Sequence, residues 1–348
     1  MVRLSFNKAS IQRYIITKQP AEIIVTSGNA IIKYTDETIS NGSCIICSEK
    51  FCSKYSEDEL TTSSFLSFPH NTSNRVCPTS AISFSINDGR AIISSEKCIG
   101  CGLCINRCPT AAISFDMESG KAVVTFDDSI LSSVNEEEQK AFIASIEKVG
   151  RTVSSDEIKP VFFDKFEKAL ITMSKQISDL SEIVVRNTLI NMGIPCNVNA
   201  AGNNHIRTEF FGEKDGQFII GESDIVNNDT LAIPRRILDD MAVLIGRYNF
   251  DKEKVVALSV INGLPNKRTD YYEVVFDINN ILGIQIHTVT YHILWLLNYL
   301  NARLDINDFR SFVVNKDSQN LLPAIEAHIN AIRCIDGCCD GYNYRPEK

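Results

Sequence analysis

The stretch CIGCGLCINRCPTAAISF, residues 98–115, decides the fold of the first part of the chain. Two, two and three residues separate its four cysteines, and a proline follows the last one. Thiolates are soft ligands, and this spacing is typical of a loop that wraps an iron–sulfur cluster. Gly100 and Gly102 stand between the first three cysteines, where glycine lets the backbone curl tightly. The sequence therefore predicts that one cluster is bound by Cys98, Cys101 and Cys104.

A second copy of this unit precedes the first. CPTSAISFSINDGRAII begins at Cys77 and CPTAAISFDMESGKAVV begins at Cys108, so the two segments match closely along their length. Each copy predicts a helical turn after Cys-Pro and then a β-hairpin about its glycine. Upstream of the first copy, SCIICSEKFCSK supplies three more cysteines, which are Cys44, Cys47 and Cys52.

This duplication, over residues 38–126, resembles the bacterial ferredoxins that hold two [4Fe–4S] clusters. In those proteins the fourth cysteine of each run binds the other cluster. The resemblance implies two ligand sets, which are Cys44, Cys47, Cys52 and Cys108, and Cys98, Cys101, Cys104 and Cys77. A zinc site built from C-x2-C pairs is the alternative, but zinc does not require the duplicated Cys-Pro units.

The first copy departs from the ferredoxin pattern at two places. Four residues rather than two separate the second and third cysteines of its run. In addition, Cys77 follows Cys44 by 33 positions, whereas the corresponding separation in the second copy is 10. The excess lies mainly in a polar segment, residues 55–75, which we expect to loop out of the fold.

Length, net charge and the distribution of apolar residues limit the classes of protein to which the chain can belong. The chain has 348 residues, which favours two or three domains. Its 35 Lys and Arg against 43 Asp and Glu give a net charge of −8, so it lacks the basic excess of a dedicated nucleic-acid binder. The N-terminal residues lack the apolar core of a secretion signal, and no apolar run has the length of a membrane helix. We therefore expect a cytoplasmic protein without membrane contact, in which the 12 cysteines serve metal binding rather than disulfides.

We expect the chain to be organised in successive segments of the α+β class. They are a short-strand N-terminal segment (1–37), the ferredoxin-like domain (38–126), an acidic helix and linker (127–163), an α/β domain (164–330) and a cysteine-containing tail (331–348). The α/β domain begins with a long helical pattern over residues 163–193. Strands and helices then alternate, which predicts a mixed sheet flanked by helices.

The order helix, strand meander, helix and strand over residues 165–262 resembles the PD-(D/E)XK nucleases. The resemblance implies a DNA substrate, and Mg²⁺ or Mn²⁺ held by Glu209 and Glu222 on neighbouring strands, with Glu182 as the acid of the first helix. Two residues after Glu222, where the motif has lysine, this chain has Asp224. That aspartate either adds a metal ligand or marks an inactive site.

Four basic residues near this motif are candidates for nucleic-acid contact, and they are Arg235, Arg236, Lys267 and Arg268. The last two precede Tyr271 and Tyr272 in LPNKRTDYY. Basic groups beside aromatic rings suit a phosphate backbone and its bases. The alternative is a solvated loop and an ordinary helix surface. In the tail, a further candidate metal site consists of His328, Cys334, Cys338 and Cys339.

Three functions are consistent with these patterns. The first is an iron–sulfur nuclease. The second is an electron-transfer protein that serves a partner enzyme, because no G-x-G-x-x-G dinucleotide motif follows a predicted strand in this chain. The third is a structural subunit of a protein assembly, in which the clusters and an inactive nuclease fold serve assembly only. In each case the chain binds iron–sulfur clusters, and in the last two it needs a protein partner.

Overall fold

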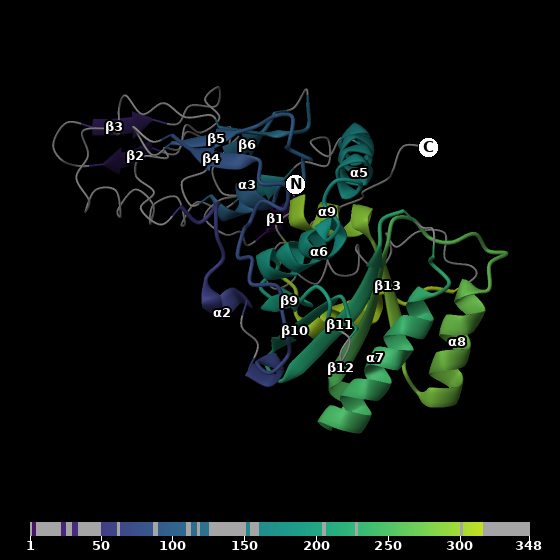
Figure 1. Ribbon diagram of the computed structural model, residues 1–348. Coiled ribbons are helices and arrows are strands. Elements are labelled where there is room, and N and C mark those ends of the chain that lie inside the picture. The colour runs from purple at the N-terminus through teal and green to yellow at the C-terminus, as the bar shows by residue number, and fades with distance from the viewer. Residues whose placement is uncertain are drawn as a thin grey trace.

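The computed structural model describes most of the chain between residues 50 and 315. In full, the described residues are 2–4, 22–25, 30–33, 50–60, 63–85, 90–108, 113–116, 119–124, 151–153, 160–203, 207–226, 229–299 and 302–315. Figure 1 shows their arrangement. Cys44, Cys47, the acidic segment near 135–148 and the tail cysteines lie outside the described residues. Within these ranges, no helix has both the length and the hydrophobicity that crossing a membrane requires.

The cysteine-rich part consists of two short antiparallel hairpins and one short helix. Strand β4 (Ile82–Phe84) pairs with β5 (Ala91–Ile93), and β6 (Ile113–Phe115) pairs with β7 (Ala122–Val124). These are the hairpins that the two copies predict. Helix α3 (Leu103–Arg107) carries the third cysteine of the second run.

Two further strand pairs lie near the N-terminus. Strand β2 (Glu22–Val25) pairs with β3 (Ala30–Lys33) in an antiparallel hairpin. Strand β1 (Val2–Leu4) pairs with β8 (Arg151–Val153), which is far away in the sequence.

The second part of the chain is built on one mixed sheet. Its strands are β9 (Cys196–Val198), β10 (Phe210–Lys214), β11 (Gln217–Asp224), β12 (Val255–Ile261) and β13 (Ile286–Thr290), in the order β13-β12-β11-β10-β9. The first three form an antiparallel meander, and β11, β12 and β13 are parallel. Mixed helix and strand content with this sheet confirms the α+β class.

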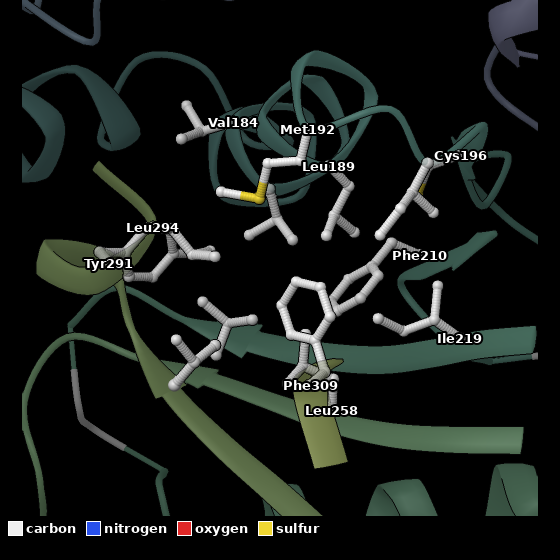
Figure 2. Packing of buried hydrophobic residues seen from close by; sticks show 14 of the residues in the cluster. Val184, Leu189, Met192, Cys196, Phe210, Ile219, Leu258, Tyr291, Leu294 and Phe309 are labelled. Carbon is white, nitrogen blue, oxygen red and sulfur yellow. The ribbon is translucent and has the colours of Figure 1, made fainter. Parts of the chain in front are cut away.

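Helices cover both faces of the sheet (Figure 1). Helices α6 (Leu180–Asn191) and α9 (Tyr291–Tyr299) lie between the sheet and the cysteine-rich part, and α5 (Pro160–Ser174) packs on both of them. Helices α7 (Ile233–Tyr248) and α8 (Tyr271–Leu282) cross between the parallel strands on the other side. Figure 2 shows the core between α6 and the sheet, where Leu189 and Met192 meet Phe210.

The single long helix expected over residues 163–193 is instead two helices. The chain leaves α5 after Ser174 and starts α6 at Leu180. The Ser174 hydroxyl donates to the carbonyl oxygen of Ile171 at 2.9 Å, and such local bonds compete with the helix. Gly193, with φ of 94°, follows the end of α6 in a backbone conformation that favours glycine.

The segment expected to loop out, residues 55–75, is instead packed against the sheet. It contains α2 (Glu57–Leu60), and its Phe65 and Phe68 are almost completely buried. The Phe65 ring lies 4.9 Å from that of Phe211, and the Phe68 ring lies 4.7 Å from that of Tyr248. The prediction was wrong because the overall polarity of the segment hid the apolar sequence FLSF.

Backbone hydrogen bonds join this segment, which we call the strap, to the edge strand β9. The amide of Asn71 donates to the carbonyl of Val198 at 2.9 Å, and that of Ala200 donates to Pro69 at 3.2 Å. The Asn197 side chain also donates to the carbonyl of Leu60. The buried side chains of the cysteine-rich part, the strap and the sheet therefore form one continuous hydrophobic cluster.

Candidate cluster site and carboxylate pocket

Four cysteines line one small, mostly apolar pocket in the cysteine-rich part. They are Cys77 from the first copy and Cys98, Cys101 and Cys104 from the second. Ile82, Ile93 and Ala122 are among the other lining residues. Cys108 is buried but does not line this pocket. The structure thus brings together the four cysteines of one implied ligand set. Cys108, the fourth cysteine of the second run, lies outside this pocket.

The loop that carries these cysteines has two left-handed residues. Gly100 has φ of 73°, and Gly102, with φ of 74°, is the residue before α3. A Cβ atom on Gly100 would stand 2.5 Å from the carbonyl oxygen of Gly120, so the loop needs glycine here for space as well as for conformation.

Backbone amides point at two of the sulfur atoms. The amide of Ala81 donates to Cys77 Sγ at 3.1 Å, and the amide of Ala122 donates to Cys98 Sγ at 3.4 Å. These donors favour thiolate over thiol. Burial and the neighbouring cysteines act in the opposite direction and raise the pKa values of the Cys98, Cys101 and Cys104 thiols. Bound cations would remove that conflict, because iron neutralises the thiolates that burial otherwise disfavours.

A cluster and a single zinc ion place different demands on the cysteines that hold them. Among the residues that the structure describes, no three His, Cys, Asp or Glu side chains converge as one shared metal ion requires. A structural zinc site needs such convergence. In an iron–sulfur cluster each thiolate binds a different iron, so the sulfur atoms stand further apart. Four cysteines around one mostly apolar pocket correspond to the ligand set of one cluster.

The other implied ligand set is only partly described. Cys52 and Cys108 are both buried, and Cys52 acts electrostatically on Cys104 of the neighbouring pocket. Cys44 and Cys47 lie outside the described residues. The geometry of a second cluster therefore stays a prediction.

Helices of the second part cover the cysteine loop. Trp295 Nε1 donates to the carbonyl of Gly100 at 2.9 Å, and Asn298 Nδ2 donates to that of Cys101 at 2.8 Å. Asn191 Nδ2 on α6 donates to the carbonyl of Leu103 at 3.2 Å. All three side chains are buried. Sequence reasoning missed them, although a lone asparagine in the apolar run YHILWLLNYL was a usable signal for a buried polar contact.

Helix α6 also holds the residues that lead into Cys77. Asn187 Nδ2 donates to the carbonyls of Arg75 and Val76 at 3.1 and 2.9 Å. The fully buried Arg186 donates from Nη1 to the carbonyl of Ser73 at 2.8 Å. The cluster site is thus built from both parts of the chain.

The carboxylates expected to form a metal site lie at the carboxyl end of β11, but on two sides of it. Glu209 Oε2 accepts hydrogen bonds from the amide and the hydroxyl of Ser223, at 2.7 and 2.6 Å. Glu222 turns instead toward α7, where it pairs with Arg236 Nε at 2.8 Å. Adjacent residues of a strand face opposite sides, which separates Ser223 from Glu222.

On the side of α6 and α9, we call the group formed by Glu182, Glu209, Ser223 and Tyr291 the carboxylate pocket. The Tyr291 hydroxyl is buried, makes no hydrogen bond of standard geometry, and lies within electrostatic reach of Glu182 and Glu209. Burial and the nearby Glu182 raise the pKa of Glu209 to about 7. A buried carboxyl group with a raised pKa beside a second acid is a candidate functional site.

On the α7 side, two more acids share a buried environment. Burial, Glu209 and Asp240 raise the pKa of Glu222. Burial also raises the pKa of Asp240, to about 7. Asp240 was missed, although it follows Arg236 by four positions and therefore shares its helix face.

Asp224 has a local structural role. Its two carboxylate oxygens accept hydrogen bonds from the amides of Val226 and Asp229, at 2.9 and 3.1 Å. It therefore stabilises the loop after β11, and these bonds compete with its expected use as a metal ligand.

The expected nucleic-acid surface is only partly available. Arg235, Lys267 and Arg268 are exposed, but Arg236 is paired with Glu222. Tyr271 is fully buried, and its hydroxyl is hydrogen-bonded to Ser259 and Thr288. Tyr272 is also buried, and its hydroxyl donates to the carbonyl of Pro265. Neither ring is therefore available to stack on a base, because the first turn of α8 inserts into the core.

Comparison with protein families gives one match. Residues 91–114, which contain the second cysteine run, match the model of the 4Fe-4S binding domain. The chain is an iron–sulfur protein. The match covers the Gly100 loop, α3 and the start of β6. It therefore includes Gly100 and Cys101, whose carbonyls accept hydrogen bonds from Trp295 and Asn298. No curated protein matches the chain.

Proposed function

We propose that this iron–sulfur protein binds two [4Fe–4S] clusters, each held by cysteines from both copies of the duplicated unit. One observation carries the proposal: Cys77 lines the pocket of Cys98, Cys101 and Cys104, whereas Cys108 does not. This is the exchange of fourth ligands that two-cluster ferredoxins use. The remaining set would be Cys44, Cys47, Cys52 and Cys108.

The chain's own groups have clear tasks in such a site. The thiolates would bind iron, and the amides of Ala81 and Ala122 would stabilise the charge on sulfur. The apolar walls at Ile82 and Ile93 keep water away. A bound cluster supplies one-electron chemistry, structural stability, or both. Because oxidants destroy such clusters, we expect the protein to work in the cytoplasm.

The cluster number is tested by chemical analysis of anaerobically prepared protein. Iron and sulfide contents that correspond to two clusters, and magnetic interaction between them in the electron paramagnetic resonance (EPR) spectrum of the reduced protein, are the expected results. Iron for a single cluster, or zinc in its place, would reject the proposal.

A second candidate function is suggested by the carboxylate pocket. We propose that Glu209 and Glu182 hold Mg²⁺ or Mn²⁺ and that the protein hydrolyses phosphodiester bonds of DNA. The grouping of these acids with the buried Tyr291 favours it, as does the order of helix, three-strand meander, helix and strand. Two carboxylates suffice for Mg²⁺, which keeps several waters and uses substrate phosphate as a further ligand. Bound metal would activate water and stabilise the leaving oxygen.

Two observations oppose this second function. No lysine occupies the position of Asp224, and Asp224 itself is engaged in the loop after β11. Glu222 lies on the other side of the strand, 2.8 Å from Arg236 Nε. The competing proposals are that the clusters pass electrons to a partner protein, or that the chain is a structural subunit of an assembly. The buried contacts of α6 and α9 with the cysteine loop support a structural contribution of the cluster under each of them.

A plasmid-nicking assay under anaerobic conditions tests the nuclease proposal. Cluster-loaded wild type with Mg²⁺ or Mn²⁺ is compared with Glu209→Gln and with Asp277→Asn, an exposed acid of α8 that serves as the control. Cleavage by wild type and Asp277→Asn but not by Glu209→Gln would support the nuclease. Absence of cleavage, or cleavage that survives Glu209→Gln, would reject it and leave the cluster proposal intact.

A further inference from the structure

One face of α9 touches both the cysteine loop and the carboxylate pocket. Tyr291, Trp295 and Asn298 are spaced by four and three residues, which places them on the same side of the helix. Trp295 and Asn298 donate to carbonyls of the cysteine loop, and the Tyr291 hydroxyl lies in the carboxylate pocket. At the helical rise, the two ends of this face are separated by about 10 Å.

At the cluster end, Asn298 is fully engaged. It donates to the carbonyl of Cys101 at 2.8 Å, and its Oδ1 accepts from Asn106 Nδ2 at 2.9 Å and from Asn191 Nδ2 at 3.2 Å. This buried network joins α3, α6 and α9. Because bonds from thiolates to a cluster fix the loop between Cys98 and Cys104, they also fix the carbonyls on which α9 rests.

At the pocket end, the Tyr291 hydroxyl interacts with the Ser223 side chain, although not in standard hydrogen-bond geometry. Figure 2 shows its ring packed with Leu294 near Val184 of α6. The Thr290 hydroxyl accepts from the amide of Ile293 at 3.3 Å and so fixes the first turn of the helix. The first turn of α9 therefore places the Tyr291 hydroxyl beside Ser223.

We propose that α9 couples the cluster to the carboxylate pocket: the cluster-loaded loop holds α9 through Trp295 and Asn298, and α9 holds Tyr291 against Glu209 and Ser223. The proposal rests on the cluster assignment and not on the nuclease assignment. Coupling of this kind is reciprocal, so a change at either end is felt at the other.

Amide hydrogen exchange of the full-length, cluster-loaded protein tests the coupling, because it measures local opening of each element. Two regions report on it. The amides of residues 291–299 report on α9, and the amide of Ser223 reports on the pocket directly because it donates to Glu209 Oε2. In Asn298→Ala, with the cluster retained by its visible absorbance, we expect exchange in both regions to become roughly fivefold faster or more.

Asn197→Ala is the matched control, because it removes a buried asparagine that also donates to a backbone carbonyl, but from β9 and not beside the cysteine loop or the carboxylate pocket. It should leave both reporters unchanged. Faster exchange in α9 without a change at Ser223 would overturn the coupling, and so would an equal response to Asn197→Ala. If Asn298→Ala does not fold, Trp295→Phe takes its place with the same outcomes, because it removes the bond to Gly100 and keeps an aromatic ring.

Discussion

At the scale of single residues, the two Cys-Pro cysteines differ in their surroundings although their sequences are nearly the same. Cys77 reaches the pocket of the second run, and Cys108, at the end of α3, is directed elsewhere. Under the proposed assignment, the two copies cross, so the cluster that each of these cysteines binds does not follow from distance along the chain. This difference can be tested one cysteine at a time.

We expect Cys77→Ser to lose the cluster of the Cys98 run and to keep the other, and Cys108→Ser to do the reverse. Iron analysis should show about half of the wild-type content in each variant, with different residual EPR signals. Cys196→Ala, a buried cysteine of β9 outside the pocket, should keep the full content. Identical residual signals in the two serine variants would show that the ligands do not cross.

The buried acids at the end of β11 predict an unusual dependence of stability on pH. The pKa values of Glu209, Glu222 and Asp240 are raised, chiefly by burial, so the folded state retains protons that the unfolded chain releases near the ordinary carboxyl range. The folded state is therefore favoured below that range. This contribution to stability is lost as the pH rises through about 7, the raised pKa of Glu209.

Urea unfolding at a series of pH values measures this slope. We expect the free energy of unfolding to fall as the pH rises, and Glu222→Gln, which copies the protonated form, to flatten the fall. Glu253→Gln changes an exposed acid and should keep the wild-type slope. A stability that increases with pH over the same range would contradict the assignment.

At the scale of elements, the strap has a role that its length alone does not suggest. It lies between Cys52 and Cys77, which the proposal assigns to different clusters, and it inserts two rings into an aromatic group beside β10. Its backbone extends the edge strand β9. The insertion that lengthens the first copy is thus the element that joins it to the sheet.

Phe65→Ala should reduce the free energy of unfolding by about 3–5 kcal/mol, because it leaves a cavity among Phe211, Phe218 and Phe250. The neighbouring Leu66 is 63% exposed, so Leu66→Ala should change stability by less than about 0.5 kcal/mol. Urea unfolding followed by circular dichroism measures both. Equal effects of the two substitutions would mean that the strap does not pack as described.

At the scale of the whole molecule, the cysteine-rich part and the part built on the sheet pack against each other through buried side chains. One hydrophobic cluster runs from Ile99 and Leu103 through α6 to the sheet, and side chains of α6 and α9 bind loop carbonyls across the boundary. Metal binding that fixes such a loop also contributes to folding energy. The cysteine-rich part and the sheet are therefore expected to depend on each other for stability.

Thermal unfolding of the cluster-loaded protein should accordingly show one transition. Far-ultraviolet circular dichroism, which reports the helices and the sheet, and the visible absorbance of the clusters should be lost at the same temperature. Asn187→Ala weakens the boundary and should lower that temperature for both signals together. Loss of the absorbance well before loss of the secondary structure would show that the parts unfold independently.

Local patterns predicted much of this fold. The cysteine spacing, the two hairpins and the order of helices and strands along the chain depend on short-range sequence, and the structure confirms the hairpins and the mixed sheet. The docking of Phe65, the burial of Tyr271 and the pairing of Glu222 with Arg236 depend on distant partners. No periodicity encodes such contacts. For the same reason, Glu209 and Glu222 look equivalent in sequence but face different helices.

Trp295 is the chain's one tryptophan, and its indole rests on the loop of the second cysteine run. Iron–sulfur clusters absorb across the near-ultraviolet and visible range, so a loaded cluster would take up the energy of the excited indole without emission. The intensity of tryptophan emission would then be low in the protein that holds the cluster and high in the protein without it. The fluorescence of Trp295 would therefore report cluster assembly and cluster damage as they happen, without an added label.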